Sequence, residues 1–528
     1  MKTTYLNSVL KLGIGLLVSS ASLYAMQFEN AKNIIDTKCT ACHSGNLDSG
    51  LSRISEQRKS PEGWFMTISR MENSHGLVLS DVEKRSVVKY LADTQGLNPD
   101  ETESYRYVLE KTPNYQEKHE NQFLTEMCAR CHSEARFSLQ RRTTQEWNNL
   151  IEFHLGQFPT LEYQALSRDR DWFSIAKDEI VPLLSKSFGN DTNFEKIDAN
   201  YEGTWSLYGH KLGDGDFSAT MSAKKVSNDV YKLTLKGNYL DGREFNATGE
   251  AVVYSGYEWR ATLDLDGIAF NQVFKMNPKS QELKGSMFET LHSEEYSYIK
   301  GVKSSNTKSV VLGVYPKSIK AGESEVITIS GNNLDGKVKL SSGLKINTIL
   351  EKTASKIVLD VTASSKYDSK QVDLSVGSIK LDKELTVYKK IDVLKVFPSY
   401  AIARVGDGGG VMPKQHAIFE AIGYLAGNDG KLGTNDDISL GKVDAKWSVA
   451  PFDKRAKEDQ DIKFAGTMDS FSGRFTPSFA GPNPLRRFGT NNAGNLKVIA
   501  TYKDNNETLK ADSHLMVTVQ KWVNSPIN

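Results

Sequence analysis

The chain has 528 residues, which is enough for roughly three to five domains, so several folded units are expected. Its 66 Lys and Arg residues balance 65 Asp and Glu residues, and with a net charge of +1 nucleic acid is not an expected partner. Hydrophobic residues make up 39% of the chain, which is sufficient for ordinary cores.

The N-terminal segment, residues 1–25, has the pattern of a secretory signal peptide. Lys2 and Lys11 give it a positive start, residues 12–18 are apolar, and small residues precede a cleavage position after Ala25. The apolar stretch is too short to span a membrane, and no later segment approaches the necessary length. We therefore predict export to the periplasm without a membrane span after cleavage. A retained N-terminal anchor is the alternative.

Two short strings carry the most specific chemical signal: Cys39-Thr40-Ala41-Cys42-His43 and Cys128-Ala129-Arg130-Cys131-His132. Both are C-x-x-C-H, the attachment signature of c-type haem. The two thiols form thioethers with the porphyrin vinyl groups, and the adjacent His is the proximal iron ligand. We therefore predict two covalently bound haems.

The alternatives are a structural zinc site and a redox dithiol. Zinc would need four ligands brought together from a different spacing, and a dithiol would not need the His that follows. The two strings use all four cysteines of the chain, so no disulfide is expected. The exported fold must then depend on core packing and haem burial.

Residues 26–190 form the predicted dihaem cytochrome c domain. Apolar residues recur there at helical spacing, as in Val87, Val88 and Leu91, so the domain should be helical.

This domain contains an internal repeat that predicts the distal ligands. Trp64 follows the first motif and Met71 lies seven residues beyond it, while Trp147 follows the second motif and His154 lies seven residues beyond it. Met and His are both competent sixth ligands of haem iron. We predict that His43 and Met71 bind the iron of haem one, and that His132 and His154 bind the iron of haem two.

Other residues compete for the distal positions. Met66 and His75 lie on either side of Met71, and Met127 and His119 precede the second motif, where Met127 is expected to pack against its own helix. Met ligation raises the haem potential relative to two imidazoles, so electrons should pass from haem two to haem one. Two six-coordinate irons indicate electron transfer rather than peroxide chemistry.

Beyond about residue 191 the chain is mostly strand, with short alternating runs separated by Gly, Asn and Asp turns. Residues 195–302 are expected to form a closed or nearly closed antiparallel barrel. Residues 308–390 resemble an immunoglobulin-like module, and residues 391–528 form a longer C-terminal Ig-like module. The predicted fold class is multidomain α + β, with the helical dihaem domain followed by three antiparallel β domains.

No catalytic residue is predicted in the β domains, which lack nucleophile-elbow, phosphate-loop and metalloprotease strings. The acidic loop Asp429–Asp437 is a candidate calcium site, but it lacks the spacing of an EF-hand and is interpreted as a surface turn. His210, His292, His416 and His514 are expected to be surface or packing residues.

The whole pattern resembles the α subunit of quinohaemoprotein amine dehydrogenase over nearly the entire mature chain. The strings that carry the resemblance, besides the two haem motifs, are Gly203-Thr204-Trp205 with Gly209, Gly213 and Gly215, Ala403-Arg404-Val405-Gly406, Asp429-Gly430-Lys431, Asp436-Asp437-Ile438, Phe475-Thr476-Pro477, Ala480-Gly481-Pro482-Asn483-Pro484 and Val517-Thr518-Val519-Gln520-Lys521-Trp522.

The resemblance implies a role within an oxidoreductase complex. In that family the α subunit joins a β-propeller subunit and a small subunit that carries a cysteine tryptophylquinone. Primary amines are oxidised there to aldehyde and ammonia, and electrons leave through the α-subunit haems to a periplasmic cytochrome c or blue copper protein. This chain has no cysteine left for a quinone crosslink, so the substrate chemistry is expected on a partner subunit.

Three other functions stay open from the sequence. The chain could serve a different periplasmic dehydrogenase, such as one that oxidises alcohols or sugars. It could be a self-contained dihaem peroxidase, which would need an accessible sixth position on one iron. It could also be an adhesion protein that uses its Ig-like modules.

Overall fold

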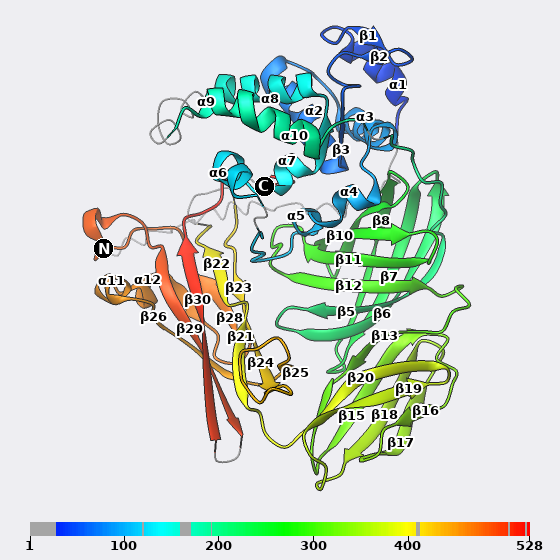
Figure 1. The fold of residues 1–528 in the computed structure, drawn as a ribbon, viewed down its shortest axis with the longest axis vertical. Coiled ribbons are helices and arrows are strands. Elements are labelled where there is room, and N and C mark those ends of the chain that lie inside the picture. The colour runs from blue at the N-terminus through cyan, green and yellow to red at the C-terminus, as the bar shows by residue number, and fades with distance from the viewer. Residues whose placement is uncertain are drawn as a thin grey trace, which may run out of the picture.

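The structure is a computed structural model that describes residues 28–118, 121–158, 170–191, 193–407, 412–504, 507–522 and 525–527. The predicted signal peptide lies outside these residues. Helices gather at one end of the molecule, a β-barrel lies below them, and a β-sandwich lies at the far end (Figure 1). The C-terminal β domain lies beside the barrel. The predicted fold class is confirmed.

In its described residues the first domain contains helices of 4 to 15 residues and four strands of two or three residues. Its helical segments are α1 (Ala31–Ile34), η1 (Ile35–Cys39), α2 (Pro61–His75), α3 (Asp81–Thr94), α4 (Pro99–Glu103), α5 (Arg106–Leu109), α6 (Gln122–Cys128), α7 (Ala135–Ser138), α8 (Thr144–Gln157), α9 (Trp172–Ile175), η3 (Ala176–Ile180) and α10 (Val181–Ser187). Its strands are β1 (Gly45–Asn46), β2 (Gly50–Leu51), β3 (Gln57–Lys59) and β4 (Gln140–Arg142).

The repeat seen in the sequence is also a structural repeat. Helix α2 is capped by the Ser60 hydroxyl and helix α8 by the Thr143 hydroxyl, each accepting a backbone N–H three residues on. Trp64 and Trp147 are fully buried, and each indole donates to a backbone carbonyl, at 3.0 Å and 3.3 Å respectively. Strands β3 and β4 pair antiparallel directly before the two helices, so the halves meet there.

The second domain is a closed barrel in which each strand pairs with the next and the last with the first. Its strands are β5 (Gly203–Lys211), β6 (Gly215–Ser227), β7 (Val230–Tyr239), β8 (Glu244–Tyr254), β9 (Glu258–Leu265), β10 (Ile268–Asn277), β11 (Glu282–Glu289) and β12 (Tyr296–Lys303). Large side chains such as Trp205, Phe217 and Trp259 fill the interior. A Cβ at Gly209 would lie 2.3 Å from the Phe217 ring, so packing at this level requires glycine.

The third domain is a sandwich of two four-stranded sheets with an apolar core between them. One sheet contains β13 (Val310–Tyr315), β15 (Ser324–Asn332), β18 (Lys356–Ala363) and β17 (Leu344–Lys352), and the other β14 (Ser318–Lys320), β20 (Ile379–Tyr388), β19 (Lys370–Val376) and β16 (Val338–Leu340).

The fourth domain has three sheets, formed by β21 (Val393–Phe397), β24 (Glu420–Leu425) and β25 (Ile438–Lys442), by β22 (Tyr400–Arg404), β30 (Glu507–Thr518), β29 (Gly494–Asp504) and β26 (Lys446–Pro451), and by β23 (Ala417–Ile418), β28 (Arg474–Pro477) and β27 (Gly466–Met468). It also carries α11 (Lys454–Glu458), α12 (Asp461–Phe464) and η4 (Arg487–Gly489). Each of the last two domains contains a parallel strand pair, β14 with β20 and β22 with β30. In both, a short turn containing Pro316 or Pro398 moves the chain from one sheet to the other.

The end of the chain returns to the helical domain (Figure 1). The Lys111 ammonium donates to the carbonyls of Ser525 and Pro526 at 2.9 Å and 2.8 Å. In the part of the chain that the structure describes, no helix is both long enough and apolar enough to cross a membrane.

His210 joins the barrel to the fourth domain. Its two ring nitrogens lie 3.0 Å from a carboxylate oxygen of Asp216 on one side and of Glu420 on the other. The second oxygen of Glu420 accepts the backbone N–H of Gly213 at 3.0 Å. Both ring nitrogens are therefore donors, which requires the charged imidazolium.

Burial alone would lower the pKa of His210, but the hydrogen bonds to Asp216 and Glu420 outweigh it and raise the pKa to about 10. Because the unfolded value is about 6.5, the stabilisation is complete below that pH and is lost as the pH rises through about 10. We expect His210→Gln to lower the unfolding temperature at neutral pH, with the difference from wild type shrinking towards pH 10. A difference that stays constant over that window would contradict a charged His210.

Candidate haem sites

The first haem motif lies at the end of a helical turn. Cys39 ends η1, and the backbone N–H groups of Cys42 and His43 both donate to the Cys39 carbonyl, at 3.1 Å and 3.0 Å. The Nδ1 atom of His43 lies 2.8 Å from the Ser52 carbonyl oxygen, which it contacts as donor. This contact fixes the tautomer and leaves Nε2 as the ligand atom, the usual arrangement of a metal-binding His.

Next to this motif is a cavity of about 840 Å³, here called the first cavity. Cys39, Cys42 and His43 line it, and Met71, on the third turn of α2, lines it as well. Much of its remaining lining is apolar, including Ile35, Ile54, Trp64, Ile68, Leu77, Val87, Leu91, Leu150 and Phe153. A large apolar cavity with a thiol pair, an oriented imidazole and a thioether fits a c-type haem.

The second motif has the same design. Cys128 ends α6, and Nδ1 of His132 lies 2.9 Å from the Ser133 carbonyl oxygen. His154 of α8 turns its own Nδ1 to the Leu150 carbonyl oxygen at 2.7 Å. Both imidazoles line a second cavity of about 530 Å³ together with Cys128 and Cys131.

Burial lowers the pKa of His132 and of His154, and nearby cations add to the effect. Both rings are therefore neutral at pH 7, the form that binds iron. Burial also raises the pKa of the Cys39 thiol, and that of Cys128 to about 12. Thiols held in the protonated form do not suit the redox dithiol that the sequence left open.

The two cavities share one wall, here called the cation wall. It is formed by the charged residues Lys59, Arg70 and Arg142 and by the uncharged residues Thr67, Leu150 and Phe153. The Lys59 side chain is buried, with its ammonium 2.6 Å from the Thr67 hydroxyl and 5.1 Å from the centre of the Trp64 ring. The Arg70 guanidinium lies 4.5 Å from the centre of the Phe153 ring.

Nearby acidic side chains do not fully balance the positive charges of the cation wall. Arg142 is 3.3 Å from Glu146, which also pairs with Arg53 at 2.9 Å. Among the described residues no carboxylate pairs with Lys59 or Arg70. Burial lowers the pKa of Lys59 well below its usual range, and repulsion from Arg142 and Arg70 adds to it.

An uncompensated buried cation is costly, so the cation wall favours an anion. Each haem has two propionate groups, and such carboxylates would compensate the buried charges of Lys59 and Arg70. The residues present therefore fit a haem in each cavity, and Lys59, Arg70 and Arg142 would be the cations available to its propionates.

Four family models match the chain in succession. They describe the haem-binding domain of the quinohaemoprotein amine dehydrogenase α subunit at residues 29–194, domain II at 198–304, domain III at 308–389 and domain IV at 394–527. The chain belongs to the α subunits of quinohaemoprotein amine dehydrogenase. It is thus a haem-binding electron-transfer subunit of an oxidoreductase that contains further subunits.

Other comparisons add no functional information. No curated protein sequence matches this α subunit. Among solved structures, the redesigned β-barrel mFAP1 bound to DFHBI is 16% identical, with a TM-score of 0.17, over 19% of this chain and 91% of that one. The Bacteroides ovatus mixed-linkage glucan protein SGBP-B is 10% identical, with a TM-score of 0.18, over 62% and 67%. Drosophila N-cadherin EC1-3 is 10% identical, with a TM-score of 0.21, over 57% and 89%.

The alternative distal ligands of this α subunit differ in the cavity that they line. Met66 lines the second cavity and not the first, for which the sequence had offered it as an alternative. Met127 is buried in the core around Trp172, so it packs against helices other than its own, and it also lines the second cavity. His75 lines the first cavity from the exposed end of α2. His119 lies outside the described residues.

The cations of the shared wall were not identified in the sequence, although the repeat contains a signal for two of them. Lys59 lies five residues before Trp64, and Arg142 lies five residues before Trp147. A basic residue at the same repeat position in both halves could have indicated a shared role. Burial and the choice of acidic partners are tertiary properties, so the signal alone would not have distinguished these residues from surface charges.

Charge removal at Lys59 tests the cation wall. We expect Lys59→Met to lower both haem potentials, because a positive charge next to both cavities favours the reduced irons. A shift of about 59 mV corresponds to a tenfold change in a one-electron equilibrium, and we expect this order of magnitude in a potentiometric titration.

Lys38→Met is the matched control. Lys38 lines only the first cavity, its side chain is 35% exposed, and it pairs with Glu83 at 2.6 Å. Its removal should have little effect on either potential. Equal shifts for the two variants, or a Lys59→Met shift at only one haem, would contradict a charge shared between the cavities.

Proposed function

We propose that this α subunit binds two c-type haems through Cys39, Cys42, Cys128 and Cys131. The irons would be held by His43 with Met71 and by His132 with His154. The observation that supports this most strongly is that each motif opens on a cavity with a second ligand side chain in its lining. When bound, the haems supply reversible one-electron exchange.

The protein residues orient the ligand side chains and shield the two cavities from water. The carbonyls of Ser52, Ser133 and Leu150 fix the imidazoles through Nδ1, and the apolar linings limit the access of water. Arg70 directly precedes Met71 in the sequence, and Phe153 directly precedes His154. The Arg70 guanidinium stacks on the Phe153 ring and so holds α2 and α8 together. The two cavities are therefore neighbours, which suits rapid electron transfer between them.

We further propose that the electrons come from a quinone on a small partner subunit, where primary amines are oxidised to aldehyde and ammonia. They would leave to a periplasmic cytochrome c or blue copper protein. All four cysteines lie in the haem motifs, so the chain has none for a thioether-linked quinone of its own. This supports a division of labour in which substrate oxidation belongs to a partner.

The fourth domain offers surface for a partner such as the β-propeller subunit. Large apolar side chains are exposed there, namely Phe471, Phe479, Leu485, Phe488 and Trp522. Exposed aromatic side chains of this kind are enriched where one protein binds another.

Purification of the native protein from a periplasmic extract tests the proposal. Haem spectra and mass analysis of every co-eluting chain should show two covalent haems on this subunit and a small subunit with quinone crosslinks. A solitary chain with two haems would overturn the amine dehydrogenase assembly, and peroxide turnover by that chain would instead establish a peroxidase.

A further inference from the structure

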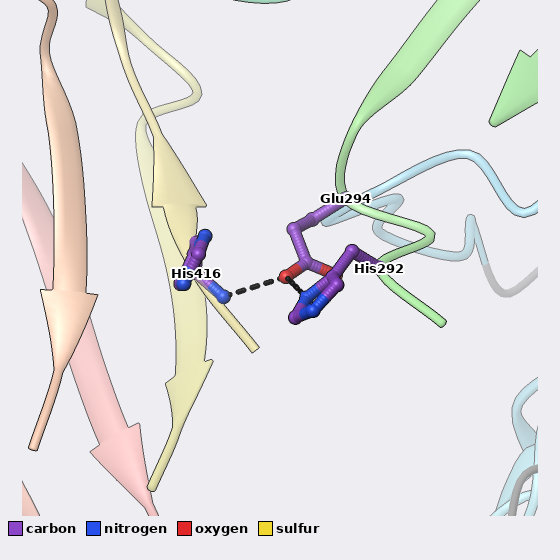
Figure 2. A group of neighbouring side chains, drawn as sticks. All are labelled: His292, Glu294 and His416. Atoms are coloured by element: carbon purple, nitrogen blue, oxygen red, sulfur yellow. Dashed lines mark hydrogen bonds and ion pairs between the residues drawn. The ribbon is translucent and has the colours of Figure 1, made fainter. Parts of the chain in front are cut away.

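Three metal-binding side chains meet at the junction of the barrel and the fourth domain (Figure 2). His292 and Glu294 lie in the loop between β11 and β12, and His416 lies directly before β23. One potential ligand atom from each residue lies within 4.8 Å of the other two. Among the described residues this is the only group of three or more His, Cys, Asp or Glu side chains with such spacing.

Hydrogen bonds already organise the three residues. One carboxylate oxygen of Glu294 accepts the backbone N–H of His416 at 2.8 Å and lies 3.2 Å from Nδ1 of His292. The two imidazole rings face each other with centres 5.3 Å apart and an interplanar angle of 23°. The carboxylate points into the space between the two chain segments (Figure 2).

The surroundings leave ligand positions available. The Nε of Arg474 donates to Nδ1 of His416 at 3.3 Å, so Nε2 of that ring is the ligand atom. The positive charge of Arg474 is balanced by its ion pair with Glu295. The Glu294 side chain is 7% exposed and the His292 side chain 24% exposed, which gives an ion a path to a largely buried carboxylate.

We propose that His292, Glu294 and His416 bind a zinc ion that ties the barrel to the fourth domain. Two imidazoles and one carboxylate form a known zinc ligand set that leaves the fourth position to water. Imidazole nitrogens favour first-row transition metals, whereas calcium and magnesium require oxygen ligands. Tetrahedral zinc with bonds of about 2.0–2.1 Å needs ligand atoms about 3.3 Å apart, so the side chains close inwards around the ion.

The zinc content of the haem-loaded protein tests this site independently of the haems. Protein stripped with a chelator is dialysed against zinc sulfate, and zinc and iron are counted by elemental mass spectrometry. We expect wild type to take up one zinc ion more than the His292→Ala/His416→Ala variant, with unchanged iron. Glu294→Gln keeps the size of the side chain but removes its charge, and should bind zinc at least about tenfold more weakly.

His514→Ala is the matched control, because His514 lies in the same domain but packs against Phe452. It should take up as much zinc as wild type. Zinc should also raise the unfolding temperature of wild type and not that of the double variant. Equal zinc affinity of wild type and Glu294→Gln, measured by titration of the stripped proteins, or no uptake by wild type, would overturn the site whatever the haem content.

Discussion

We expect Cys128→Ala/Cys131→Ala to remove one of the two proposed covalent haems and to leave the other in place. Each C-x-x-C-H supplies both thioethers of one haem, and the two motifs line different cavities. Electron transfer from the quinone subunit to the external acceptor should then be abolished, because one of two relay centres is missing. Mass analysis of the denatured chain and a haem assay measure the loss directly.

The reciprocal variant, Cys39→Ala/Cys42→Ala, is the control for this experiment. It should also retain one haem, but with the ligands of the other cavity, so the two variants should differ in midpoint potential. Two covalent haems in either variant, or the same potential for both remaining haems, would contradict the assignment of one motif to each cavity.

Met71→His should lower the midpoint potential of one haem by on the order of 0.1–0.3 V, a fraction of the roughly 0.8 V range that axial ligands span. A thioether stabilises ferrous iron relative to a second imidazole, so its replacement favours the ferric state. The first cavity would then have the same ligand pair as the second. A potentiometric titration should show two potentials approaching each other.

Met66→Leu is the matched control, since Met66 lies on the same helix but lines only the second cavity. It should leave the midpoint potential of the higher-potential haem unchanged. If Met71→His left the higher potential unchanged, Met71 would not be the distal ligand. His75 would then be the remaining candidate in the first cavity.

Part of the candidate site follows from short-range spacing. C-x-x-C-H places two thiols and an imidazole within one turn of chain, so the proximal side needs no knowledge of the fold. Met71 and His154 could be proposed because each lies seven residues after a buried Trp on a capped helix. Such offsets are preserved by helix geometry, which fixes the faces on which the residues lie.

The strand regions could also be predicted from the sequence, because the alternation of apolar and polar residues and the turn residues are local signals. The barrel was predicted as closed or nearly closed, and the pairing of β12 with β5 shows that it is closed. The roles of His210, His292 and His416 were not visible. Each of them contacts a residue from a distant part of the chain. His210 contacts Glu420, and the His292 ring lies beside the His416 ring.

The sequence by itself determined the two C-x-x-C-H strings, the helical repeat and the order of helical and β domains, because these depend on residues close together along the chain. Only the tertiary structure decided that the two cavities share a wall, that Lys59 is buried there with no acidic partner among the described residues, and that His416 meets Glu294. These features depend on contacts between distant segments, and whether a charge is buried or solvated is set by such contacts.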